Sequence, residues 1–240
     1  MISFKSGSLI PAAVIVLFCS FIYCCKKEKL SVSDQLKYLR YFPLEAGQWI
    51  EYTADSVVHL DIDDALQIDT AIRRYSFEIR EEIDSSFIDG ENQQAFIIMR
   101  YKREYDSLQW TFNNTWTAKL TANSAQRVED NIRFIKLEFP IVSSATWNGN
   151  AYNFYPEEEY SYDDLNEPAQ FGSLVFDSTV KVVQNEFVSL INRIEKNEVY
   201  ATGVGMIYKQ LDSLKTVNTP NGLVILNGLE YRQTIKDYKH

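Results

Sequence analysis

The chain has few of the residues that build metal centres and nucleophilic sites. Its three cysteines lie near the N-terminus at positions 19, 24 and 25, so the rest of the chain can form neither a disulfide framework nor a cysteine-ligated metal site. Its two histidines, His59 and His240, are too few for a histidine-rich zinc site. No Gly-x-Ser-x-Gly motif is present to place a serine nucleophile near His59. We therefore expect no metal, no cofactor and no catalytic residue, and an ordinary strand position for His59.

The chain also lacks an excess of basic residues. It has 24 Lys and Arg against 33 Asp and Glu, a formal net charge of −9. A protein of this charge repels phosphate backbones. We therefore expect no nucleic-acid partner.

A run long enough to span a membrane is missing as well. The apolar stretch from Leu9 to Tyr23 is shorter than the roughly 20 residues that a membrane-spanning helix needs. It follows Lys5 and ends abruptly before Lys26, which is the layout of a secretory signal. Residues 1–24 are therefore predicted to be a signal peptide that takes no part in the fold.

The end of this leader indicates a lipid anchor. Residues 22–25, Ile-Tyr-Cys-Cys, resemble a bacterial lipobox, in which an aliphatic residue stands three positions before the modified cysteine and a small residue directly before it. The resemblance implies that Cys25 is acylated after cleavage and attaches the protein to a membrane. Acylation at Cys24 stays open, although it would place the bulky Tyr23 at the small position.

After the leader, the chain divides into a tether and one domain. Residues 25–40 are mostly polar and are predicted to be a tether, whereas residues 41–240 carry repeated strand signals. In Arg74–Arg80, apolar Tyr75, Phe77 and Ile79 alternate with polar residues, which is typical of a half-buried strand. Asp89-Gly90 then predicts a hairpin turn. The expected strands are Gln48–Thr53, Arg74–Arg80, Ala95–Tyr101, Gln109–Lys119, Arg133–Phe139, Val175–Leu190, Val199–Leu211 and Gly228–Tyr238.

Local hairpins without strand-helix alternation favour an all-β fold with a single antiparallel domain. A curved sheet, half-barrel or lipocalin-like barrel is expected, with a β-sandwich as the alternative. Segment 186–196 also fits helical spacing, but it has no helix caps, so a long strand that ends near Asn192 is favoured. Turns are expected at Asn113-Asn114 and at Asn221-Gly222.

Short aromatic and glycine patches resemble a known family. The opening Tyr41-Phe42-Pro43-Leu44 with Gly47, Trp49 and Tyr52, the segment 146–152 (TWNGNAY) and the segment 198–205 (EVYATGVG) are similar to uncharacterised outer-membrane lipoproteins of Bacteroidetes-type bacteria. The resemblance implies no activity. It implies an outer-membrane location, and because Lys26, Lys27, Glu28 and Lys29 follow the cysteine rather than a run of acidic residues, the periplasmic face is favoured over the cell surface.

Three further patterns are weak candidates for sites. Asp61–Asp69 is rich in carboxylates but lacks the glycine and the final glutamate of an EF-hand, so a solvated acidic loop is expected. The same interpretation applies to Glu157–Asp164. Gly203-Val204-Gly205 lacks the third glycine of a dinucleotide fingerprint, so we expect a bulge or a close backbone approach there.

These observations favour a non-catalytic envelope lipoprotein that binds a protein or a surface polymer. The alternative is a carrier that holds a lipid or another apolar ligand in a barrel cavity. An apolar interior would favour the carrier, whereas a filled interior would favour the interaction module.

Overall fold

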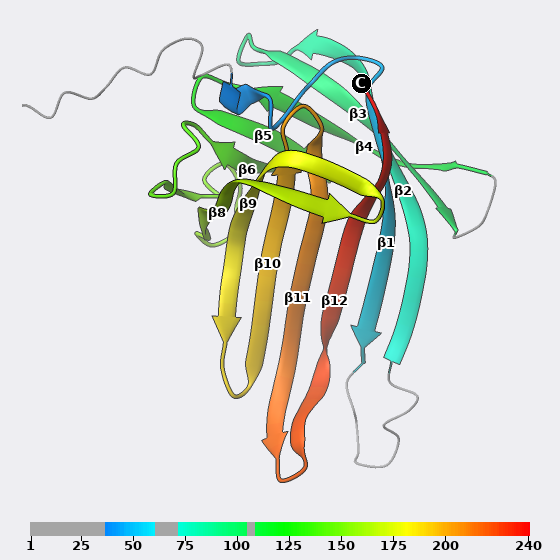
Figure 1. Ribbon diagram of the computed structural model, residues 1–240, viewed down its shortest axis with the longest axis vertical. Helices are drawn as coiled ribbons and strands as arrows, with labels where there is room; N and C mark the ends of the chain where they lie inside the picture. The colour runs from blue at the N-terminus through cyan, green and yellow to red at the C-terminus, as the bar shows by residue number, and fades with distance from the viewer. Residues whose placement is uncertain (1–36, 61–71, 105–108) are drawn as a thin grey trace, which may run out of the picture. The chain divides into compact units, whose positions relative to one another are not determined.

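The computed structural model describes residues 37–60, 72–104 and 109–240. These residues belong to one compact unit, Val32–His240, and form a single antiparallel sheet of twelve strands (Figure 1). Cys25 lies outside the described residues. The strands are β1 (Trp49–His59), β2 (Ile72–Ile88), β3 (Gln94–Glu104), β4 (Thr111–Leu120), β5 (Ser124–Glu129), β6 (Ile132–Glu138), β7 (Thr146–Asn148), β8 (Glu159–Phe171), β9 (Leu174–Val188), β10 (Asn192–Ala201), β11 (Gly205–Thr219) and β12 (Gly222–Lys239).

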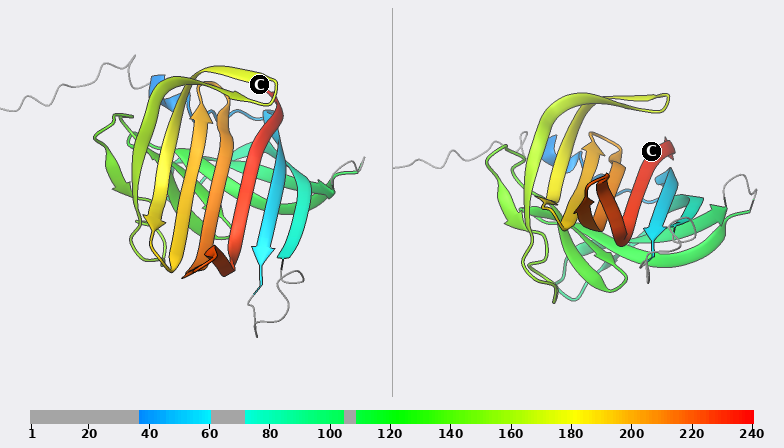
Figure 2. Two further views of the ribbon diagram at one scale, coloured as in Figure 1. Left: turned by 60° about the horizontal axis from the view of Figure 1, so that its bottom comes forward. Right: turned by 90° about the horizontal axis from the view of Figure 1, so that it is seen from below.

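The sheet order follows directly from the chain. It runs β6-β5-β4-β3-β2-β1-β12-β11-β10-β9-β8-β7, so all neighbours are consecutive strands except the pair that joins the first strand to the last. The sheet curls until its two edge strands, β6 and β7, approach each other, and Figure 2 shows the strands surrounding a common interior. Strong curvature is the usual way for a sheet of this size to bury one face.

A few hydrogen bonds close the seam between β6 and β7. The Ile135 amide donates to the Gly149 carbonyl at 3.0 Å, and the Trp147 indole donates to the Ile135 carbonyl at 3.1 Å. A Cβ atom on Gly149 would lie 2.3 Å from the ring of Tyr160. Only glycine therefore fits at this point of the seam without displacing the aromatic ring.

The segment before β1 closes one end of the barrel. Residues 37–39 form one helical turn, and the chain then places Phe42 in the core, 3% exposed and 6.1 Å from the ring of Tyr200. The Gly203 amide, in the turn between β10 and β11, donates to the Arg40 carbonyl at 2.7 Å. Burial of Phe42 by this short segment fixes the position of the N-terminal end of the domain.

The outer half of the β8–β9 hairpin bends across β11 and β12 (Figure 1). Phe171 stacks on Tyr208 with ring centroids 5.2 Å apart, and Phe176 lies 6.2 Å from Tyr238. Pro168 lies where the pairing of β8 with β9 is irregular, as expected of a residue without an amide hydrogen. The hairpin covers part of the outer face of the sheet.

The predicted all-β antiparallel fold with a strongly curved sheet is confirmed, and the β-sandwich alternative does not apply because the strands form one sheet. The hairpin turns at Asp89-Gly90 and Asn221-Gly222 are also confirmed, since each lies between paired strands. The expected strands missed β5, β7 and β8, and they covered only residues 199–201 of β10.

Three local predictions differ from the structure. The strand favoured over a helix for segment 186–196 is found, but it ends at Val188 and not near Asn192. A turn at residues 189–191 follows and β10 begins, because the Ser189 amide and hydroxyl close a turn on the Asn192 carbonyl. The expected strand Val199–Leu211 is interrupted at residues 202–204, where Gly203 has a φ of +80° that favours glycine. Asn113-Asn114 lies inside β4 and forms no turn.

Candidate functional site

Charged side chains meet across the interior of the barrel. Lys136 on β6 and Glu198 on β10 are far apart in the sheet order, yet their Nζ and Oε1 atoms lie 2.7 Å apart. Glu198 is fully buried, and its second carboxylate oxygen accepts a hydrogen bond from the Tyr200 hydroxyl at 2.6 Å. A buried carboxylate with a cation and a hydroxyl donor is fully satisfied, which offsets much of the cost of removing its charge from water.

A second carboxylate and a second lysine complete this cluster. Lys136 Nζ also lies 3.0 Å from Glu129 Oε1, and Lys209 Nζ lies 3.3 Å from Glu198 Oε1 and 3.9 Å from Glu129 Oε2. The two lysines and the two glutamates come from β5, β6, β10 and β11. Four charges of alternating sign therefore cross-link opposite walls of the barrel.

The ion pairs continue towards the closed end. Arg127 Nη1 lies 4.0 Å from Glu129 Oε1 and 3.3 Å from Glu81 Oε2, and Glu81 Oε1 accepts a hydrogen bond of 3.0 Å from Arg100 Nε. The Arg100 guanidinium lies over the ring of Trp116, 3.5 Å from its centroid, a favourable cation–π geometry. The interior is thus filled by ion pairs and aromatic rings rather than by aliphatic side chains alone.

The cluster keeps its carboxylates ionised. Burial alone would raise the pKa of Glu129, but the nearby cations of Lys136, Lys209 and Arg127 lower it to about 2. Burial opposes ionisation of Glu198 as well, and the same two lysines hold its pKa below its ordinary value. Near neutral pH both groups are negatively charged, and neither carries a proton to donate.

Beside this cluster lies a cavity of about 560 Å³, which we call the lysine cavity after Lys136, Lys196 and Lys209 in its wall. Its size falls within the roughly 300–1,000 Å³ typical of small-molecule sites. The wall combines charged, amide and aromatic side chains from β5, β6, β8, β9, β10, β11 and the loop before β8. The other lining residues are Glu129, Phe134, Asn150, Tyr155, Pro156, Glu157, Glu158, Tyr160, Gln184, Asn185 and Leu211.

Aromatic side chains stand at the rim of the lysine cavity. Tyr155 is 45% exposed and stacks on Phe134, with ring centroids 6.4 Å apart and planes 24° apart. Phe154, 80% exposed, extends this group, with its ring 4.7 Å from Tyr155. Large exposed aromatic rings beside a cavity mark an interaction surface.

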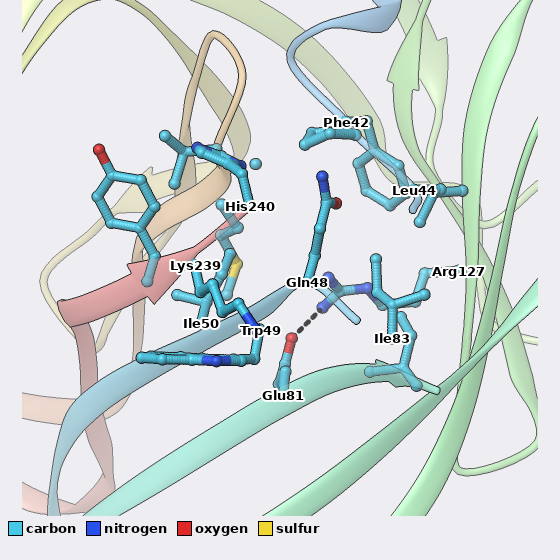
Figure 3. Close-up of a pocket in the computed structure, with 16 residues that line it drawn as sticks. Phe42, Leu44, Gln48, Trp49, Ile50, Glu81, Ile83, Arg127, Lys239 and His240 are labelled. Carbon is cyan, nitrogen blue, oxygen red and sulfur yellow. Dashed lines mark ion pairs between the residues drawn. The ribbon is translucent and has the colours of Figure 1, made fainter. Parts of the chain in front are cut away.

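A smaller pocket lies at the end that the N-terminal segment closes. Figure 3 shows it between Phe42, Trp49 and His240, with the Glu81–Arg127 ion pair at one side. Its volume is about 50 Å³, against about 560 Å³ for the lysine cavity. The lysine cavity is therefore the better candidate for a larger ligand.

No protein-family model and no curated protein matches this chain. Among solved structures, it is similar to a "putative lipoprotein" from Parabacteroides distasonis, with 12% sequence identity and a TM-score of 0.38 over 83% of this chain and 98% of that chain. At this level the likeness carries no conclusion about the present chain. The family resemblance and the lipid anchor at Cys25 therefore stay predictions.

The candidates from the sequence lie away from the lysine cavity. His59, at the end of β1, lies 2.7 Å from Glu230 on β12, so it has the ordinary strand position that was expected. Asp61–Asp69 lies outside the described residues. Gly203 lies in the turn between β10 and β11, and Gly205 begins β11. The Gly203 amide donates to the Arg40 carbonyl at 2.7 Å, so of the two expected alternatives the close backbone approach is found.

The acidic segment before and within β8 was misinterpreted as a solvated loop. Glu158 accepts hydrogen bonds of 2.8 Å from Lys196 and from Asn185 in the cavity wall. Tyr160 and Tyr162 are 4% and 6% exposed and pack against Trp147. The two-residue spacing of Tyr160 and Tyr162 is the alternation expected of a strand with one buried face. The many carboxylates around them made the segment look like a solvated loop instead.

Sequence reasoning also missed the interior cluster itself. In β10, Lys196, Glu198 and Tyr200 occupy alternate positions, which is the strand period with charged residues in place of apolar ones. Within residues 37–60, 72–104 and 109–240, no group of three or more His, Cys, Asp or Glu could hold a metal ion, and no helix is long and apolar enough to cross a membrane.

Proposed function

We propose that this chain is a non-catalytic binding protein of the cell envelope that holds its ligand in the lysine cavity. The observation that carries the proposal is the cavity of about 560 Å³ next to an otherwise filled interior. Its charged wall disfavours the alternative of an apolar carrier, because a lipid tail would remove the ion-paired Lys196 and Glu158 from water without new hydrogen bonds.

The chemistry of the innermost carboxylates supports a binding role rather than catalysis. A glycosidase of the common two-carboxylate type needs one protonated carboxylic acid, whose pKa is raised. The pKa of Glu129 is lowered to about 2, and that of Glu198 is lowered as well. Neither group can act as a general acid near neutral pH.

Lysine footprinting tests whether the lysine cavity binds anything in the envelope. The full chain is labelled with an amine-reactive ester, with and without a soluble extract of envelope polymers, and each lysine is quantified by mass spectrometry. We expect labelling of Lys196 and Lys209 to fall by about half or more once the free ligand concentration reaches the Kd. Lys181 is the matched control, because it is 33% exposed and ion-paired to Asp163, much as the 29% exposed Lys196 pairs with Glu158. Equal labelling of all three lysines with and without extract would overturn the proposal.

We also propose that acylated Cys25 attaches the protein to the outer membrane, facing the periplasm. Replacing Cys25 by serine removes the thiol that is modified, so the Cys25→Ser variant is expected to leave the detergent phase in a detergent phase-partition experiment, while the wild type stays there. Cys24→Ser is the control and should partition like the wild type. Recovery of the wild type in the aqueous phase, or of both variants in the detergent phase, would contradict acylation at Cys25.

A further inference from the structure

Each lysine in the wall of the lysine cavity is paired with a carboxylate. Lys136 and Lys209 lie against Glu129 and Glu198, and Lys196 Nζ lies 2.8 Å from Glu158 Oε1. No ammonium in this wall is left without a carboxylate partner. An anionic ligand would therefore have to compete with these carboxylates, within a chain whose formal net charge is −9.

The wall also offers an amide with no protein partner. Gln184 is 7% exposed and lines the lysine cavity, and within the described residues its side-chain amide makes no hydrogen bond. Neither of its amide atoms is fully buried, so the amide is open to the cavity. An amide supplies both donors and an acceptor. A ligand that satisfies the Gln184 amide must therefore both donate and accept hydrogen bonds.

The rim supplies an aromatic platform beside these polar groups. Tyr155 and Phe134 stack at the mouth, and Phe154 continues the aromatic surface outward. A ring with C–H groups on its faces gains dispersion and desolvation energy on such a surface. Hydroxyl groups around the edge of the same ring can reach the polar wall.

We propose that the lysine cavity is a subsite for neutral carbohydrate, in which a sugar ring stacks on Tyr155 and its hydroxyls bond to Gln184 and the Lys196–Glu158 pair. This inference rests on the proposed function and specifies its ligand class. A sugar is uncharged, both donates and accepts hydrogen bonds, and has apolar ring faces, so it matches the paired lysines, the amide without a protein partner and the aromatic rim together. Phe154, exposed beyond the cavity, extends the platform for further units of a polysaccharide chain.

The full chain is tested against an array of neutral and acidic glycans, followed by isothermal titration calorimetry with the best neutral oligosaccharide, with galacturonic acid oligomers and with palmitate. We expect binding of a neutral oligosaccharide, weakened about tenfold or more in Tyr155→Ala and in Gln184→Leu, because each removes one group that contacts the ligand. Tyr75→Ala is the matched control, since Tyr75 is 48% exposed, as against 45% for Tyr155, and lies on β2 outside the lysine cavity. Its affinity should equal that of the wild type.

Three results would overturn the carbohydrate assignment: no neutral glycan binds, the acidic oligomers or palmitate bind in preference, or Tyr155→Ala binds as well as Tyr75→Ala. If lysine footprinting still shows protection of Lys196 and Lys209 in any of these cases, the binding function stands and only the ligand class is wrong. If footprinting shows no protection, the binding function itself fails.

Discussion

Glu198→Gln is expected to lower the free energy of unfolding by about 3–5 kcal/mol, because it removes one partner of a buried ion cluster and leaves charge uncompensated. Glutamine has nearly the shape of glutamate, so packing around Tyr200 is preserved and the loss reports on charge. In the variant, Lys136 and Lys209 share the single carboxylate of Glu129. Urea denaturation followed by circular dichroism at pH 7 measures the change.

Two comparisons separate this effect from a general loss of packing. Glu230→Gln breaks the pair with His59, in which Glu230 is 35% exposed, so its cost should stay below about 1 kcal/mol. The double variant Glu198→Gln/Lys136→Met keeps the charges balanced and should be less destabilised than the sum of its single variants. A cost for Glu198→Gln that is no greater than that for Glu230→Gln would show that the interior cluster contributes little.

The same buried cluster explains which strands could be predicted from the sequence. In β2, the inward residues Phe77 and Ile79 are apolar, and their alternation with polar residues is plain. In β10, the inward residues are Lys196, Glu198 and Tyr200, and the expected strand covered only the last three residues of β10, from Val199 onward. Hydrophobic periodicity finds a strand through an apolar inner face, and where the barrel interior is charged this signal is absent.

The case of β5 follows the same reasoning. Arg127 and Glu129 face the interior, and only Ala125 on that side is apolar. The short strand β7 was missed for a different reason, since its three residues are too few to show any hydrophobic period. The hairpin turns could be predicted because Asp-Gly and Asn-Gly favour a tight turn through their own backbone conformation. This preference does not depend on what the flanking strands face.

The lysine cavity could not be derived from the sequence because its wall is assembled by sheet closure. Glu129, Glu158 and Lys196 are separated by many residues and lie together only because the sheet curls round to bring β5 near β10. The sequence contains many carboxylates and many aromatic residues, and residue type alone does not show which of them line a common cavity. Register and curvature decide which of them share one space.

The interior cluster and the lysine cavity form one structural unit. Lys136, Lys209 and Glu129 belong to both, so the ion pairs that cross-link the walls also fix the inner surface that a ligand meets. Binding surfaces held by satisfied, buried partners lose little conformational freedom when a ligand arrives. The lysine cavity therefore combines an inner surface of paired charges with a more exposed aromatic rim.

Wild-type stability is expected to fall steeply between about pH 4.5 and pH 2 because of the interior carboxylates. The pKa of Glu129 is about 2 in the folded chain against an ordinary value of 4.5, so its contribution is fully present above pH 4.5 and is lost as the pH falls through the folded pKa. For Glu129 alone this amounts to a loss on the order of 3 kcal/mol. Urea denaturations across this pH range measure the free energy of unfolding. The Glu129→Gln variant should give a flatter curve of stability against pH, which converges with that of the wild type at the lowest pH.

Glu138→Gln is the control. Burial raises the pKa of Glu138, so removing this carboxyl should make the loss of stability at acid pH steeper. Parallel curves for the wild type and Glu129→Gln would show that the lysines do not hold this carboxylate ionised.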